Sequence, residues 1–200
     1  MALPAIPILE GDAVRLEPLE HRHAAELSIA CAEDNLFELW YTVIPSPEGM
    51  AAEIDRRLGL YEAGTMMPFA TIDKASGKAI GMTTFMNMKL ENFKVEIGST
   101  WMAPSAQGTA INPEAKLLML GYAFKVLGCN AVELRTHEKN AQSRAAIEKL
   151  GAKLDGLLRN DMVMANGTIR TTAVYSITKD EWPQVHDDLV ARLDALDEKN

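Results

Sequence analysis

One segment constrains the fold of this chain more than any other, the stretch Ser105-Ala-Gln-Gly-Thr-Ala-Ile-Asn-Pro-Glu-Ala-Lys116. It joins a strand-like run to a helix through a turn rich in small residues. Asn112 is a good N-cap and Pro113 suits the first helical position, so the sequence predicts that a helix begins here. Its unpaired N–H groups would lie beside Gly108, which lets a ligand approach the backbone closely. The segment therefore predicts a backbone site for a phosphate.

The residues around this turn exclude two familiar nucleotide-binding loops. No Gly-Lys-Ser/Thr follows Gly108, as a Walker loop would require, and the glycine spacing of a dinucleotide-binding fingerprint is absent. We therefore expect a different pyrophosphate as the ligand. The residues expected to surround it are consecutive: Gln107, Gly108, Thr109, Ala110, Ile111 and Asn112.

The pattern of apolar residues predicts alternating strands and helices along the rest of the chain. The expected strands are 13–18, 67–72, 79–88, 93–102, 131–137, 153–163 and 169–177. The expected helices are 20–33, a helix capped by Ser46 with Pro47 as its first residue, 113–127, 141–150 and a last helix from Lys179 onward. Strands 67–72, 79–88 and 93–102 should form antiparallel hairpins.

This order of elements predicts an α/β fold in which one mixed sheet has helices on both faces. At 200 residues the chain can bury a large core and still be one domain. We expect a single domain over 1–200, with a core of about 13–178 and a C-terminal helix of about 179–197.

Composition excludes several classes of function. A net charge of −8 argues against a nucleic-acid binder; it either favours a cationic acceptor such as an amine or simply supports solubility. Cys31 and Cys129 are too few for a disulfide framework, which suits a reducing compartment. Without an apolar run of membrane-spanning length, we expect a cytoplasmic protein with no membrane partner. His21 and His23 diverge on the predicted helix, so we expect no metal site.

Further motifs extend the pattern on both sides of the phosphate turn. They are Val14-Arg-Leu-Glu-Pro18, Gln107-Gly108, Asn112, Lys116, Asn140, Ser143, Lys149-Leu-Gly-Ala152, Asp155-Gly-Leu-Leu-Arg159, Tyr175-Ser-Ile177 and Glu181-Trp182. In this order and spacing they resemble the GCN5-related N-acetyltransferase (GNAT) superfamily, most closely its branch that includes the ribosomal-protein N-terminal acetyltransferases. The resemblance covers most of the chain, from about Val14 to Trp182.

The resemblance implies a mostly antiparallel sheet of about seven strands in which one parallel pair splays apart. It also implies that acetyl-CoA fills the wedge, with its pantetheine along strand 93–102 beside Ser99, Thr100 and Trp101. The pair Gly98-Ser99 is a plausible bulge that would open this strand. Asn140 is implied to hydrogen-bond the pantetheine, although a plain helix N-cap is an alternative that does not exclude it.

The transfer of an acetyl group needs an amine without its proton and a way to reprotonate the leaving thiolate. Strand alternation places Glu96 opposite an apolar face, toward the acceptor, where it could take the amine proton; an ordinary exposed carboxylate is the alternative. That apolar face consists of Phe93, Val95, Ile97 and Trp101. The resemblance places Ser143 near the sulfur, so either Ser143 or water protonates the thiolate. Ile147 stands where many members have a tyrosine.

The interpretation we reach is an acetyl-CoA-dependent N-acetyltransferase in which a neutral amine attacks the thioester directly within a ternary complex. The acceptor is either a protein N-terminal α-amine or a small-molecule amine. The resemblance implies that Trp40 and Tyr41 form part of the acceptor wall, while a hydrophobic anchor for their loop is the alternative. A non-catalytic acyl-CoA-binding module with the same fold is the alternative function. The resemblance also implies a possible homodimer.

Overall fold

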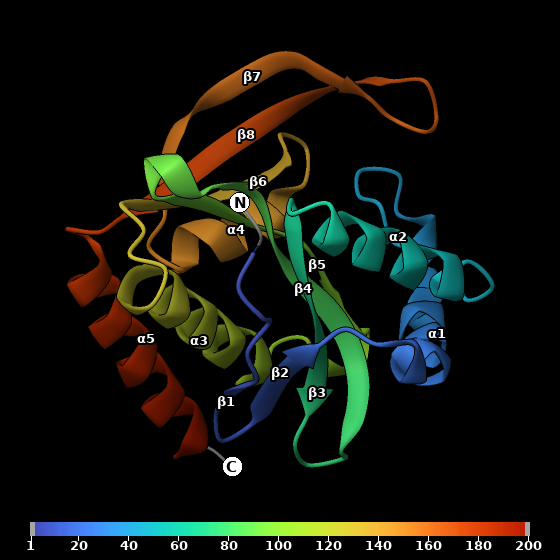
Figure 1. Cartoon of the computed structure of the whole chain (residues 1–200), viewed down its shortest axis with the longest axis horizontal. Helices are drawn as coiled ribbons and strands as arrows, with labels where there is room; N and C mark the ends of the chain where they lie inside the picture. The colour runs from blue at the N-terminus through green and yellow to red at the C-terminus, as the bar shows by residue number, and fades with distance from the viewer. Residues whose placement is uncertain (1–2, 199–200) are drawn as a thin grey trace.

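The structure is a computed structural model that describes residues 3–198, and the described elements form one eight-stranded sheet with helices on both faces (Figure 1). The strand order is β1-β2-β3-β4-β5-β6-β8-β7, and among the described strands only β5 and β6 are parallel neighbours. The strands are β1 (Leu9–Glu10), β2 (Val14–Pro18), β3 (Met66–Asp73), β4 (Lys78–Lys89), β5 (Lys94–Met102), β6 (Ala131–His137), β7 (Lys153–Val163) and β8 (Ile169–Thr178).

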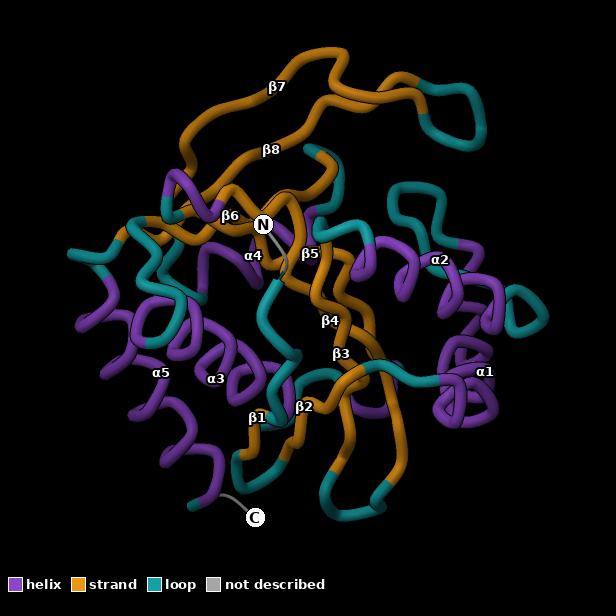
Figure 2. The backbone as a smooth tube through the Cα atoms, viewed as in Figure 1, coloured by secondary structure: helices purple, strands orange, loops and turns teal. Residues whose placement is uncertain are grey.

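Two groups of helices enclose the sheet (Figure 2). Helices α1 (Ala24–Ala32) and α2 (Met50–Glu62) cover one face, and α3 (Ile111–Lys125), α4 (Ala141–Lys149) and α5 (Trp182–Asp197) cover the other. Short 3₁₀ turns connect several elements: η1 (His21–His23), η2 (Glu33–Glu38), η3 (Leu90–Asn92) and η4 (Pro104–Ala106). None of the helices within residues 3–198 is long and apolar enough to cross a membrane.

The predicted fold class is confirmed, including the antiparallel hairpins of β3, β4 and β5. All seven predicted strands are present with small differences at their ends. The described chain has an eighth strand, β1, in which Leu9 pairs with Leu16 and Glu10 with Arg15. A strand of two residues is too short to show the alternation by which strands are recognised in a sequence.

Three helices begin later than the sequence predicts. α1 begins at Ala24 rather than at Glu20, after the 3₁₀ turn η1. α2 begins at Met50 rather than beside Ser46, whose hydroxyl accepts a hydrogen bond from the Gly49 nitrogen at 3.2 Å and closes the preceding turn. α5 begins after a turn in which the Thr178 nitrogen donates to the Glu181 carboxylate at 2.9 Å. At the starts of α2 and α5 a bond between a side chain and the backbone stabilises a turn where the sequence predicted helix.

The start of α3 also differs from the prediction. α3 begins at Ile111, before Pro113, so Asn112 lies inside the helix and is not its N-cap. The Thr109 hydroxyl takes over part of that role, because it accepts a hydrogen bond from the Ile111 nitrogen at 3.3 Å. Threonine is itself a favourable capping residue, so the sequence contained two competing caps.

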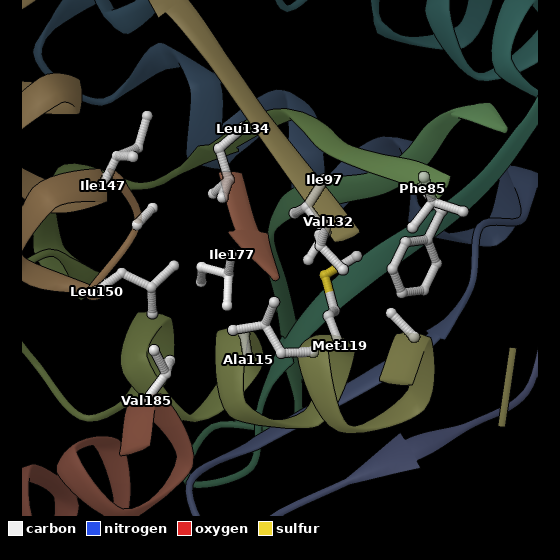
Figure 3. Packing of buried hydrophobic residues seen from close by; sticks show 14 of the residues in the cluster. Phe85, Ile97, Ala115, Met119, Val132, Leu134, Ile147, Leu150, Ile177 and Val185 are labelled. Carbon is white, nitrogen blue, oxygen red and sulfur yellow. The ribbon is translucent and has the colours of Figure 1, made fainter. Parts of the chain in front are cut away.

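The larger of two hydrophobic clusters lies between the sheet and α3, α4 and α5. Figure 3 shows its centre, where residues of β5 and β6 pack on α3, with Ile147 from the last turn of α4 and Val185 from the first turn of α5 at the sides. The strand residues there include Ile97, Val132 and Leu134, and α3 contributes Ala115 and Met119. This packing holds α3 against the two parallel strands and so determines where its N-terminus points.

The predicted β-bulge at Gly98-Ser99 is present. Thr84 pairs with Gly98 and Met82 with Trp101, so β5 has one residue more than β4 in this interval. Ser99 takes up the extra length with φ 46°, a left-handed conformation that is uncommon for serine.

The bulge reverses the side-chain alternation of β5. Val95 and Ile97 pack in the cluster with α3, whereas Trp101 packs in the second cluster with Leu27 beneath α1 and α2. The prediction that Trp101 shares a face with Val95 and Ile97 is therefore wrong. Phe93 is also absent from that face: it precedes β5 in a turn, with φ 51°, and is 52% exposed.

Candidate active site

The parallel strands β5 and β6 diverge after a short paired region. Their pairing covers Lys94↔Ala131, Val95↔Val132 and Glu96↔Glu133, although β5 continues to Met102 and β6 to His137. A cavity of about 700 Å³ opens beside this divergence, within the range of about 300–1,000 Å³ common for ligand pockets. Beyond Glu96, the edge of β5 that faces β6 is left without a strand partner among the described residues, and its backbone groups are available to a ligand.

The phosphate turn predicted from the sequence forms one end of this cavity. Gly108 has φ +79°, and a Cβ added to it would meet no atom within 4 Å, so its backbone faces open space. The Gln107 side chain holds the turn in place: its amide donates to the Met102 carbonyl at 3.4 Å and accepts from Gln142 of α4 at 3.0 Å. Gln107, Gly108, Thr109 and Asn112 line the cavity. Ala110 and Ile111 complete the turn without lining it, and Ile111 packs into the core.

Glu96 lies on the cavity wall just before the bulge. It is only 5% exposed, so the alternative of an ordinary exposed carboxylate is wrong. Asn87 donates to its carboxylate at 2.7 Å from a left-handed position on β4, with φ 47°, a conformation that asparagine tolerates well. Gly98 gives this carboxylate room, since a Cβ at that position would lie 2.9 Å from the Glu96 oxygen Oε1.

Burial raises the pKa of the Glu96 carboxyl above its ordinary value. The hydrogen bond from Asn87 and the charge of Arg135 act in the opposite direction, and burial prevails. Arg135 Nε lies 3.4 Å from Glu96 and its Nη2 lies 2.9 Å from Glu133, so the guanidinium is shared between two carboxylates. Lys94 also pairs with Glu133. A carboxyl with a raised pKa is better matched to proton transfer near neutral pH.

Asn140 and Ser143 lie at the start of α4, and both line the cavity. The Asn140 side-chain oxygen accepts from the Ser143 nitrogen at 3.0 Å, so Asn140 is an N-cap as the alternative interpretation states. Its amide NH₂ has no hydrogen-bond acceptor among the described residues and is available to a ligand. Ile147 is one turn further on, is 8% exposed and belongs to the core cluster.

The structure separates the two aromatic residues proposed for the acceptor wall. Tyr41 lines the cavity together with Thr42 and Val43. Trp40 is not part of that wall among the described residues; it is 47% exposed and packs edge-on against Tyr41 and His137, with ring centroids 5.6 Å and 5.3 Å apart. The contacts of Trp40 favour the anchor interpretation, and those of Tyr41 favour a position beside the acceptor.

Lys116 is a buried cation on the cavity wall to which sequence reasoning assigned no role. It lies on α3, is 8% exposed, and its amine donates to the Thr100 hydroxyl at a long 3.4 Å. No carboxylate within the described part of the chain lies close enough to form an ion pair with it. Burial therefore lowers the pKa of Lys116 to about 8. The one signal in the sequence that could have marked Lys116 as a site residue was its place in the motif pattern. A lysine in an apolar helix otherwise usually extends its amine to solvent.

Two further features could not be read from the sequence. The Trp101 indole nitrogen is buried in the core beneath α1 and α2 without a hydrogen-bond partner among the described residues. The Glu114 carboxylate accepts from the backbone nitrogens of Asp12, Ala13 and Val14 at 2.7–2.8 Å and thereby ties β2 to the first turn of α3. Within residues 3–198 no group of three or more His, Cys, Asp or Glu residues could hold a metal ion.

Comparison with known proteins identifies several relatives. A family model described as an acetyltransferase (GNAT) domain matches residues 13–153. YdaF of Bacillus subtilis (strain 168), provisionally named a ribosomal N-acetyltransferase, is 34% identical over 106 residues, which are 53% of this chain and 57% of that protein. The match with this curated relative thus spans little more than half of its length.

Solved structures resemble this one over most of the chain. A GCN5-related N-acetyltransferase from Brucella melitensis superposes with a TM-score of 0.84 at 34% identity, covering 95% of this chain and 86% of that one. Mycobacterium smegmatis RimJ, solved in complex with CoA-disulfide, has a TM-score of 0.76 at 24% identity and covers 92% of this chain and 91% of its own. The second likeness concerns the fold alone.

Proposed function

The chain belongs to the GNAT family of acetyltransferases, and from that premise we propose that it transfers an acetyl group from acetyl-CoA to a primary amine by direct attack within a ternary complex. The observation that carries this proposal is the divergence of β5 and β6 after the Glu96↔Glu133 pair, with the cavity beside it. A pantetheine can extend the sheet along the free edge of β5, as peptides do in strand addition. The phosphate turn at the end of that edge receives the pyrophosphate.

The cavity fits such a ligand in three respects. The backbone at Gly108 is open for a pyrophosphate, and the edge of β5 beyond Glu96 offers backbone groups near Ser99, Thr100 and Trp101, apart from the Ser99 carbonyl, which already accepts from Arg57 at 3.2 Å. The Asn140 amide lines the cavity and lacks an acceptor in the described structure, and an amide-containing arm would supply one.

Glu96 acts as the base in this proposal. It accepts the proton of the amine, directly or through a water, and the neutral nitrogen attacks the thioester carbonyl. Backbone N–H groups at the Ser99 bulge stabilise the oxyanion of the tetrahedral intermediate. The attacking nitrogen then loses its remaining extra proton to water as the C–S bond breaks. The CoA thiolate takes a proton either from the Ser143 hydroxyl, which water reprotonates, or directly from water. Ile147 is apolar and buried, so it cannot serve as the acid that a tyrosine would provide.

Lys116 contributes a positive charge behind β5 in the same proposal. Its amine lies 3.4 Å from the hydroxyl of Thr100, on the strand that would hold the pantetheine. A buried ammonium without a carboxylate gains from an acceptor oxygen on the ligand. We assign Lys116 to the binding of the acyl-CoA carbonyl groups.

The acceptor is a primary amine, either a protein N-terminus or a small molecule. The provisional name of YdaF favours a ribosomal protein N-terminus. A non-catalytic acyl-CoA-binding module is the competing function, and Ile147 in place of a tyrosine is the feature that favours it. Both cysteines are free and buried, which supports a cytoplasmic location.

A second copy of the chain is the protein partner that we propose. β7 lies at the edge of the sheet, and the β7–β8 hairpin arches away from the rest of the molecule (Figure 1). Apolar side chains are unusually exposed along it: Leu154, Leu157, Leu158, Met162, Val163 and Ile169. An exposed apolar edge strand invites pairing with another chain.

Release of free thiol from acetyl-CoA, measured with a panel of amines and N-terminal peptides, tests the function. We expect release that depends on the amine, together with an acetylated product that is 42 Da heavier by mass spectrometry, roughly the mass added when an acetyl group replaces a proton. Calorimetric binding of CoA without release for any amine would favour the non-catalytic module. Absence of CoA binding would overturn both functions.

A further inference from the structure

Arg170 lines the cavity but has no role in the proposed acetyl transfer. It lies near the start of β8, opposite Met162 of β7, and is partly buried. Its Nε donates to the Thr172 hydroxyl at 2.9 Å. Its two terminal nitrogens have no hydrogen-bond partner among residues 3–198, and no described carboxylate lies within 4.0 Å of them. Arg170 therefore lines the cavity with a guanidinium whose terminal edge is unoccupied.

The neighbouring guanidinium of Arg135 differs in this respect, because it is already bound by Glu133 and Glu96. Burial lowers the pKa of Arg170, the charges of Asp161 and Glu96 raise it, and that of Arg135 lowers it again. A partly desolvated cation beside another cation is unfavourable unless an anion completes the site. Asp161 and Glu96 act on it only from beyond ion-pair distance.

The position of Arg170 relative to Glu96 indicates what that anion is. Both side chains line one cavity, and each contributes to the electrostatic environment of the other. If Glu96 takes the proton of the acceptor amine, the rest of the acceptor extends along the cavity wall past Arg170. An arginine whose Nε is held by a hydroxyl offers two parallel N–H groups, which match the two oxygens of a carboxylate.

We propose that Arg170 binds a carboxylate of the acceptor, so that the substrate is an amine that carries a carboxylate a short distance from the reacting nitrogen. This inference rests on the proposed function, in which Glu96 receives the amine. The carboxylate belongs either to a free amino acid or to an acidic residue near a peptide N-terminus. Thr172 holds the guanidinium in the orientation that this contact needs.

Matched acceptors test the proposal by the ratio of kcat/KM for a carboxylate acceptor to that for its amide. One arm compares amino acids with their α-amides, and the other compares peptides that differ only by Glu or Gln at the second position. We expect a ratio of about 10–100 in at least one arm, as for a charge-assisted hydrogen bond of about 1.5–3 kcal/mol. The arm that shows it identifies the source of the carboxylate.

Two variants relate the ratio to Arg170. R170Q should bring it to about 1, and R170K, which keeps a point charge but not the fork, should leave an intermediate ratio. R159Q is the matched control, since Arg159 is an exposed arginine on the same hairpin and does not line this cavity; it should keep the ratio of the parent. Melting temperatures of all three show whether the hairpin still folds. If R170Q does not fold, the ratio of the parent and that of R170K decide whether Arg170 binds the carboxylate.

Three results overturn the inference or its premise in distinguishable ways. Turnover in the parent with a ratio near 1 in both arms removes the carboxylate subsite and leaves the acetyltransferase intact. A high ratio that R170Q and R170K both preserve assigns the carboxylate to another cation. No turnover with any acceptor of either arm contradicts the proposed function itself.

Discussion

The Oε2 atom of Glu96 lies 3.4 Å from Nε of Arg135, beside the last rung at which β5 and β6 still pair. This contact brings a carboxylate of β5 and a guanidinium of β6 together at the point where the two strands begin to separate. It orients the carboxylate toward the cavity and limits how far burial raises the pKa of Glu96.

Glu96→Gln should lower kcat at pH 7 by about 10²–10⁴-fold and leave CoA affinity nearly unchanged, because the amide keeps the shape and cannot accept the proton. The deficit should shrink as pH rises, since an amine with a pKa near 10 then deprotonates without help. Stopped-flow or steady-state rates from pH 6 to 10 measure this. Glu91→Gln, an exposed carboxylate after β4, is the control and should behave as the parent does. An unchanged pH–rate profile in Glu96→Gln would move the proton transfer to bulk water.

Gly108→Val should abolish most CoA binding, because its Cβ direction faces the open end of the cavity where the pyrophosphate is proposed. Gln107→Ala should have a smaller effect through loosening of the turn. Gly167→Val is a matched control: Gly167 has φ +78° against +79° for Gly108, also faces open space, and lies in the β7–β8 turn. Calorimetry should show the loss of binding in Gly108→Val alone, and equal losses at both glycines would attribute it to backbone strain.

Asn140 should contribute to fold stability through its cap and to acetyl-CoA binding through its free amide, and variants can separate the two. Asn140→Asp keeps the oxygen that accepts from Ser143 but removes the NH₂ donor, so it should raise KM for acetyl-CoA with little change in melting temperature. Asn140→Ala should raise KM for acetyl-CoA and should also lower the stability of the fold by about 1 kcal/mol, because the cap is lost. Kinetics together with calorimetric melting distinguish these effects. A normal KM in Asn140→Asp would leave Asn140 as a plain cap.

Ser143→Ala should lower kcat without changing the affinity for acetyl-CoA if the hydroxyl protonates the thiolate. Its backbone nitrogen still donates to Asn140, so α4 should keep its N-terminus. A solvent isotope effect on kcat, compared between the parent and the variant, reports the proton step. Parent-like rates would assign that proton to water.

Lys116→Met should stabilise the fold and weaken acetyl-CoA binding. The pKa of Lys116 is lowered from 10.5 to about 8, and each pKa unit corresponds to about 1.4 kcal/mol, so the buried ammonium destabilises the fold by roughly 3 kcal/mol. This penalty is fully present below pH 8 and disappears as pH approaches 10.5, the value in the unfolded chain. Urea unfolding at pH 7 and pH 10 should therefore give a gain that is larger at pH 7.

Lys125→Met provides the comparison for that gain, since Lys125 is an exposed lysine at the end of the same helix and should change neither property. A Lys116→Met protein that is less stable than the parent at pH 7 would mean that the ammonium is already paired in the folded protein.

Much of this arrangement could be predicted from the sequence, and the predictions that were right concern local physics. Gly108 and the small residues around it indicated an open turn before a helix, because chain flexibility and helix termini act over a few neighbouring residues; the phosphate that this turn would bind stays a prediction. Period-two alternation located the strands for the same reason, and Gly98-Ser99 marked the bulge. The resemblance of motifs such as Asn140 and Lys149-Leu-Gly-Ala152 added the parallel pair of strands in a mostly antiparallel sheet.

Tertiary structure alone decided which distant side chains share the cavity. Glu96 is a buried base candidate rather than an exposed carboxylate because β4 brings Asn87, and β6 brings Arg135, against it. The bulge moved Trp101 to the opposite face of the sheet, which no alternation rule could show. Lys116 and Arg170 became site candidates because packing and strand pairing leave no carboxylate within ion-pair distance of them among the described residues. The absence of a partner depends on the whole fold and not on neighbouring residues in the sequence.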